Sequence, residues 1–99
     1  MSCNRTQLCG RLETRGMLRF SPAGIALVKF TIAHRSEQQE AGASRKSNCT
    51  VRAVAAGEVA QNIAQLPAHA QVSVSGFLAQ ASRTDSALVL HVQNFEWIE

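Results

Sequence analysis

The chain lacks the features that mark membrane, secreted and metal-binding proteins. No apolar run among its 99 residues approaches the ~20 residues of a membrane-spanning helix, and the polar start over residues 1–6 is unlike a signal peptide. Its three cysteines are an odd number with no pair at metal-ligand spacing, which argues against a disulfide framework and a zinc site. We therefore expect one domain over residues 1–99, located in the cytoplasm, with no metal and no cofactor.

Catalytic motifs are absent too. The three histidines, His34, His69 and His91, are far apart in the sequence, and none adjoins a nucleophile in a recognisable motif. Glu37 and Glu40 form a pair of carboxylates, but they lie in a polar segment and are interpreted as solvated. No glycine-rich loop has the spacing that cradles phosphate. We therefore expect that the protein is not an enzyme, and we interpret His34 and His91 as hydrogen-bonded structural residues within strands.

Aromatic residues are scarce, with four Phe, one Trp and no Tyr. Proteins that bind single-stranded nucleic acid stack bases on aromatic side chains, at ~1–3 kcal/mol per base. Phe30 follows the core pattern, and Phe95 and Trp97 are expected in the core or an interface. Only Phe20 and Phe77 remain as candidate platforms, and packing in the protein is the alternative for both. Any binding to nucleic acid should thus depend on charge and fall steeply with salt.

Basic residues are concentrated in the first half of the chain. Residues 1–52 hold nine Lys or Arg and three Glu, a net charge of +6, whereas residues 53–99 hold one Arg and four acidic residues, a net charge of −3. Eight of the ten cations are arginine, whose guanidinium forms forked contacts to phosphate and stacks on bases. This asymmetry predicts a one-sided surface for a polyanion. The alternative is a solvated face that only keeps the domain soluble.

Alternating apolar and polar residues predict five strands and one helix. We expect the strands over residues 7–15, 25–35, 47–56, 71–81 and 88–98. The helix is expected over residues 57–66, where Val59, Ile63 and Leu66 share one face and Pro67 prevents continuation. This order predicts an all-β fold, a five-stranded oligonucleotide-binding (OB) barrel with one short helix between strands three and four. Alternation alone leaves an SH3-like barrel open, and the position of the helix favours the OB form.

The segments between these elements carry further predictions. The sequence Ser21-Pro22-Ala23-Gly24 predicts a tight turn, and residues 36–46 are polar and predict a long hairpin loop that is mobile at residues 41–44. Gly10 and Gly76 interrupt strand patterns and predict bends that help a small barrel to close. Cys9 and Cys49 lie in strand-like segments and are interpreted as small core residues.

A set of short motifs runs in one order through nearly the whole chain. They are Ser21-Pro22-Ala23-Gly24-Ile25, Phe30, His34-Arg35-Ser36, Gln38, Glu40-Ala41-Gly42, Cys49, Gly76-Phe77 and Leu90-His91. This set closely resembles the primosomal replication protein N (PriB) family. The resemblance implies a homodimeric OB-fold protein, similar to single-stranded DNA-binding protein, that binds single-stranded DNA in the replication-restart primosome. It also implies two protein partners, the restart helicase PriA, which it would stabilise on DNA, and the adaptor DnaT, which brings in the helicase loader.

Candidate DNA-contacting residues follow from the expected barrel, in which ligand crosses strands two and three and is flanked by two loops. Those segments carry eight cations and one aromatic candidate: Arg15, Arg19, Phe20, Lys29, Arg35, Arg45, Lys46, Arg52 and Arg83. The resemblance adds that Arg19 precedes the Ser-Pro turn where the family has a basic residue. It also places Arg83 in a loop that contacts DNA in the family.

Two other functions stay open at this point. The basic face could meet an acidic protein partner, so that the domain bridges proteins and contacts nucleic acid only weakly and incidentally. The barrel could instead bind RNA, which a preference for RNA over DNA of equal length would reveal.

Overall fold

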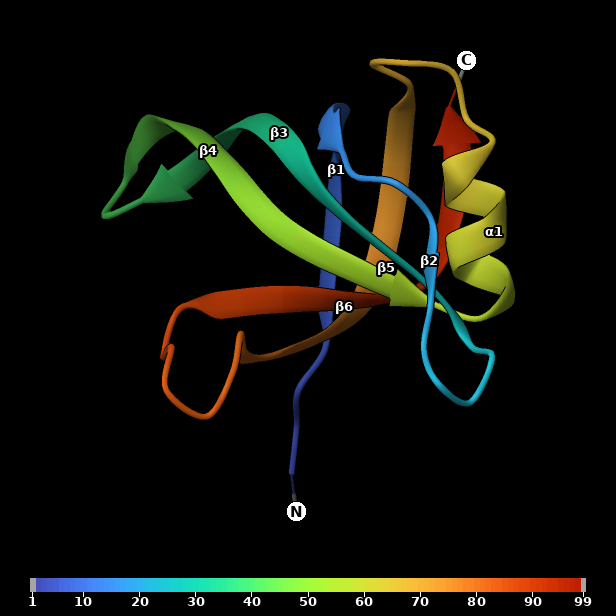
Figure 1. Cartoon of the computed structure of the whole chain (residues 1–99). Coiled ribbons are helices and arrows are strands. Elements are labelled where there is room, and N and C mark those ends of the chain that lie inside the picture. Colours follow the sequence, from blue (N-terminus) through green and yellow to red (C-terminus); the bar gives the residue numbers. More distant parts are fainter. Residues whose placement is uncertain (1, 99) are drawn as a thin grey trace.

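The structure is a computed structural model that describes residues 2–98 (Figure 1). Its elements are β1 (Thr6–Arg15), β2 (Arg19–Phe20), β3 (Ala26–Glu40), β4 (Ala43–Ala56), α1 (Glu58–Ala64), β5 (Gln71–Gln80) and β6 (Leu88–Ile98). The five predicted strands correspond to the long strands β1, β3, β4, β5 and β6. The two-residue strand β2 was not predicted, because a pattern of two residues carries no period. It also shifts the numbering, so that the helix between the third and fourth long strands lies between β4 and β5.

The long strands close into a barrel. The sheet runs in the order β1-β5-β6-β4-β3-β2, and a further pairing of β1 with β3 closes the ring. All pairings are antiparallel except the one between β4 and β6, which places Ala53 beside Leu90. This topology confirms the predicted OB barrel and removes the SH3-like alternative that alternation had left open.

The inward residues of the barrel strands and one face of α1 form a single core. Ile32, Ile63 and Leu90 are at most 1% exposed, and α1 packs against β3, β4 and β6. The helix follows Gly57, whose φ of 73° is readily adopted only without a side chain. No helix within residues 2–98 has the length and apolar character to cross a membrane.

The distal halves of β3 and β4 form a projecting two-stranded ribbon, residues 34–50, which we call the arm (Figure 1). Residues 34–40 and 43–49 pair with each other, whereas β1 pairs with β3 over Phe30–Ala33 and β6 pairs with β4 over Ala53–Ala55. The prediction of a long loop over residues 36–46 was therefore wrong. Ala41 and Gly42 form the turn, with φ of 53° and 79°, as in a two-residue type I′ hairpin. Both faces of the arm are polar, so the alternation that reveals a strand is missing.

Two smaller predictions also need correction. Cys9 and Cys49 are exposed, because Cys9 lies on the outer face of β1 and Cys49 lies on the arm, beyond the barrel core. Gly76 does mark a bulge, at the register shift between Ser75 and Gly76. The shift in β1 instead falls between Leu12 and Thr14, and Gly10 serves close packing, since a Cβ there would lie 2.5 Å from the carbonyl oxygen of Ala33.

Candidate nucleic-acid interface

A groove of about 470 Å³ lies on the outer face of the barrel. Its side chains include Lys29 and Thr31 from β3, Arg52 and Val54 from β4, and His91 from β6. Strand register explains this grouping, because Lys29 pairs with Val54, Thr31 pairs with Arg52, and Val54 pairs with His91. Residues paired across adjacent strands point to the same face. The groove therefore combines two cations with a hydroxyl and an aromatic ring.

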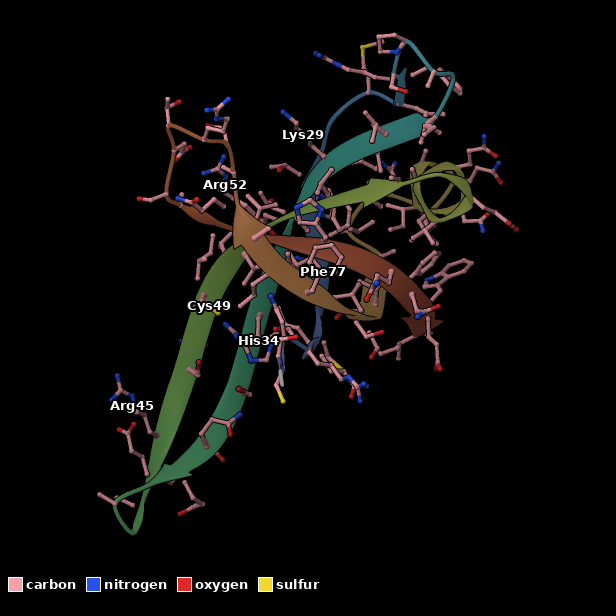
Figure 2. All side chains as sticks on the ribbon, turned by 90° about the horizontal axis from the view of Figure 1, so that it is seen from below. Lys29, His34, Arg45, Cys49, Arg52 and Phe77 are labelled. Atoms are coloured by element: carbon pink, nitrogen blue, oxygen red, sulfur yellow. The ribbon has the colours of Figure 1, made fainter. Side chains whose placement is uncertain are left out.

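An aromatic pair, which we call the aromatic wall, stands at one side of the groove. The rings of Phe77, on β5, and His91 are stacked, with centroids 4.8 Å apart and planes inclined by 6°. Both residues are half-buried, and His91 lines the groove. Figure 2 shows Phe77 with Lys29 and Arg52 at the barrel, while Arg45 lies far out on the arm. The wall offers a flat surface beside positive charge.

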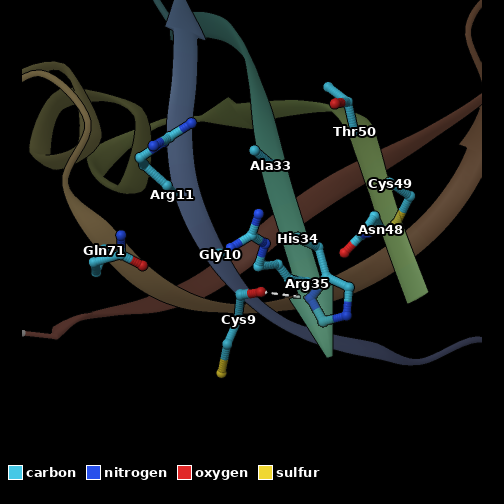
Figure 3. Close-up of a pocket in the computed structure, with 10 residues that line it drawn as sticks. All are labelled: Cys9, Gly10, Arg11, Ala33, His34, Arg35, Asn48, Cys49, Thr50 and Gln71. Carbon is cyan, nitrogen blue, oxygen red and sulfur yellow. Dashed lines mark hydrogen bonds between the residues drawn. The ribbon is translucent and has the colours of Figure 1, made fainter. Parts of the chain in front are cut away.

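A second hollow, of about 640 Å³, lies where the arm leaves the barrel (Figure 3). Arg11 from β1 and Arg35 from β3 contribute its cations. His34 lies within hydrogen-bond distance of two groups, with Nδ1 2.7 Å from the carbonyl oxygen of Cys9 and Nε2 2.8 Å from Ser36 Oγ. Since a carbonyl only accepts, Nδ1 donates its proton. These bonds join the arm to β1 and confirm the structural interpretation of His34.

Arg45 and Lys46 occupy opposite faces of the arm, because consecutive residues of a strand alternate in direction. Arg45 Nη1 lies 2.8 Å from Glu40 Oε1, and Lys46 is paired in register with Glu37. The predicted solvated carboxylates are therefore strand residues that neighbour these cations. Acidic neighbours lower the positive potential that the arm presents to DNA.

Arg15 has a structural role. Its Nη1 donates to the carbonyl oxygens of Ile63 and Leu66, at 2.9 and 2.6 Å. Ile63 belongs to the last turn of α1, and Leu66 lies two residues beyond its end. The Ile63 carbonyl also accepts from the amide of Leu66 at 3.2 Å, and a cation is favoured at this end of a helix. The guanidinium is thereby engaged within the protein. Arg19 and Phe20 are exposed on β2, and neither lines the groove or the hollow.

The loop between β5 and β6 reaches the groove through an acidic residue. Asp85 Oδ2 lies 3.7 Å from Arg52 Nη1, and the Asp85 side chain is fixed by accepting from the amide of Ala87 at 3.0 Å. Arg83 is exposed in the same loop. The loop thus places an acidic side chain beside Arg52, where it would compete with a phosphate.

The sequence placed the cations on the correct strands and offered Phe77 as a candidate platform, but it gave no sign of its stacking partner, His91. Lys29 and Arg52 were predicted as DNA-contacting residues on the second and third strands, and they do line the same groove. His91 was interpreted as a structural residue, although its place in the alternation with Val89 pointed it outward. Among residues 2–98, no group of three or more His, Cys, Asp or Glu side chains is arranged to hold a metal ion.

Comparison with known proteins gives this site its context. Residues 4–94 match the model of a family described as another single-strand binding protein family. Replication restart protein PriB of Nitrosomonas europaea is 35% identical over 95 residues, which cover 94% of this chain and 88% of the relative. The PriB of Proteus mirabilis is 37% identical over 102 residues, covering 100% of this chain and 97% of the relative.

Solved structures agree with the sequence relatives. The structure of PriB from Ralstonia solanacearum superposes with a TM-score of 0.89 at 28% identity, covering 99% of this chain and 100% of that one. The single-stranded DNA-binding protein of Thermus aquaticus has a TM-score of 0.79 at 22% identity, covering 98% of this chain and 50% of that one. The second likeness shows the fold alone. The chain therefore belongs to the PriB family of replication restart proteins, within the single-strand binding protein family that its residues 4–94 match.

Proposed function

We propose that the protein is a non-enzymatic accessory factor of replication restart that binds single-stranded DNA across the outer face of β3 and β4. The observation that carries this proposal is the groove, where Lys29 and Arg52 stand beside the aromatic wall at His91. A basic track next to flat aromatic surfaces is the arrangement that single-strand binders use. Family membership supports the ligand and the role, since residues 4–94 match a single-strand binding protein family and relatives are named as replication restart proteins.

The bound strand would leave the groove along β3. Arg35 extends the positive track towards the arm, because it lies on the same face of β3 as Lys29 and lines the second hollow. Arg83 would meet the strand from the loop between β5 and β6. Each phosphate that such a cation neutralises releases condensed counterions, so affinity should fall with rising salt.

The test is a fluorescence anisotropy titration with a labelled single strand at several salt concentrations, beside duplex DNA and RNA of equal length. We expect the DNA single strand to bind tightest, with a negative slope of log affinity against log salt. Replacing Lys29 and Arg52 together by Gln should reduce that slope by about 1.4, from about 0.7 for each lost contact. Arg5→Gln removes one cation that lines neither the groove nor the hollow and is the control for loss of charge outside the site. Tighter binding to RNA, or no binding at low salt, would contradict the proposal.

We also propose that the protein forms a homodimer and contacts PriA and DnaT in the cytoplasm, as its family resemblance implies. Exposed apolar side chains support protein contacts, since Met17 is 83%, Phe20 60% and Ile25 50% exposed. Sedimentation equilibrium should give twice the 10.7 kDa chain mass. A monomer at micromolar concentration would oppose the dimer, and failure of purified PriA and DnaT to bind would oppose those two partners.

A further inference from the structure

We infer that the wall made by His91 and Phe77 is a stacking site for one nucleobase, which enters a slot between His91 and Lys29. This inference rests on the proposed function and extends it. Cations alone would contact only the phosphate backbone of the DNA, whereas His91 would contact a base. It starts from the row of outward residues Phe77, His91, Val54 and Lys29, which are paired in turn across the adjacent strands β5, β6, β4 and β3.

The stacked rings leave one face of the imidazole free. Their centroid separation of 4.8 Å matches the spacing of neighbouring strands, about 4.8 Å. The rings therefore stand on the sheet with the face of one against the face of the other. Phe77 covers the side of His91 that faces β5, and the opposite side faces β4. His91 lines the groove and Phe77 is not among its lining residues, as this arrangement requires.

The gap between the free face of the His91 ring and Lys29 is wide enough for a nucleobase. His91 on β6 and Lys29 on β3 are separated by β4, which makes roughly 9.6 Å between their strands. Stacked bases lie about 3.4 Å apart, so a base held on both faces needs roughly 7 Å. Val54, which stands between the two in the row, is short and apolar and forms the floor. A flat ring thus fits between the imidazole and the alkyl stem of Lys29.

The neighbouring charges suit a nucleotide better than a free base. Arg52 lies one row further along, paired with Thr31, and lines the same groove as His91. The ammonium of Lys29 and the guanidinium of Arg52 would lie beside the phosphates that flank a base in the slot. Phe77 supports the imidazole from behind, so the stacking surface is held in place before DNA arrives.

The test measures the preference for a strand with bases over one without them. The purified protein is titrated with a thymidine oligonucleotide and with an abasic oligonucleotide of the same length and charge, and the ratio of the two affinities is compared among variants. We expect His91→Leu to reduce this ratio about fivefold, the equivalent of one stacked base. His91→Phe, which keeps an aromatic ring, should retain the ratio, and thermal unfolding will confirm that both variants are folded.

The outcomes separate this inference from the proposed function. Lys29→Gln should weaken binding of both oligonucleotides, and the steepness of the salt dependence should fall. If the wild-type protein binds single-stranded DNA but His91→Leu leaves the ratio unchanged, the stacking site is wrong and the charged interface stands. If His91→Phe loses the ratio as His91→Leu does, a flat aromatic surface is not what His91 supplies and the inference is overturned. If the wild-type protein binds neither oligonucleotide, the proposed function and the stacking site fail together.

Discussion

The groove and the arm carry similar cations, but the strands of the groove pack on the core and those of the arm do not. Lys29 and Arg52 in the groove are each followed by a core residue, Phe30 and Ala53, that is 3% exposed. Arg45 on the arm lies on a ribbon that is exposed on both faces, and its ion pair with Glu40 is itself exposed, at 68% and 64% of the two side chains. Exposed ion pairs contribute little, about 0–1 kcal/mol. The backbone that carries a cation on the barrel is therefore backed by the core, whereas the paired strands of the arm have solvent on both faces.

The largest expected effect tests the support beneath the groove. Leu90 is fully buried next to Ala53, so Leu90→Ala should lower the free energy of unfolding by about 2–5 kcal/mol. On the arm, Asn48→Ala removes an exposed side chain and should change it by less than about 0.5 kcal/mol. Urea denaturation followed by circular dichroism measures both. Equal losses would mean that the arm belongs to the stabilising core.

The next largest effect on stability concerns α1, the helix that packs against β3, β4 and β6. Arg15→Gln removes the donor to the carbonyls of Ile63 and Leu66. The Ile63 carbonyl keeps its bond from the Leu66 amide, so the loss falls mainly on the Leu66 carbonyl, and we expect a loss of stability of about 1–3 kcal/mol. Arg19→Gln is the matched control, since Arg19 is exposed on β2 and should be near neutral. If Arg15→Gln left the unfolding midpoint unchanged and weakened DNA binding instead, the structural role given to Arg15 would be wrong.

A direct comparison of the two regions uses paired neutral substitutions. Replacing Arg45 and Lys46 by Gln should reduce the salt slope by less than the ~1.4 expected for the groove pair Lys29 and Arg52, because Arg45 is already paired with Glu40. Reversing both charges on the arm is the stronger form of the test. An unchanged slope after reversal would exclude the arm from the interface. A loss equal to that of the groove pair would show that support by the core is unimportant.

The smallest expected effect is on DNA affinity and concerns the ion pair of Arg52 in the groove. Asp85 competes with phosphate for Arg52, at 3.7 Å, so Asp85→Asn should tighten binding of single-stranded DNA, by about fivefold at most if the exposed pair costs up to ~1 kcal/mol. Glu58→Gln, which removes the same charge from the start of α1, is the control for net charge. If both variants gained the same affinity for single-stranded DNA, the cause would be the change in net charge and not the release of Arg52 from Asp85.

The accuracy of the sequence predictions followed the presence of a buried face. The five long strands and the helix were predicted because Val28, Ile32 and Val72, for example, repeat at the period of their element and are buried. The arm was missed because neither of its faces is buried, and β2 because it is two residues long. Cys9 and Cys49 were misplaced because a small apolar residue in a strand carries no sign of which face it occupies.

The sequence by itself determined the order of the long strands and the helix and the basic character of β3 and β4, since both depend on local periodicity and composition. Only the tertiary structure decided which of these charges act together. The groove joins Lys29, Arg52 and His91 through pairings between strands distant in the sequence, one of them parallel. The bulge at Gly76 sets which residue of β5 stands beside His91. Such registers are fixed by closure of the whole barrel, so no single stretch of the chain contains them.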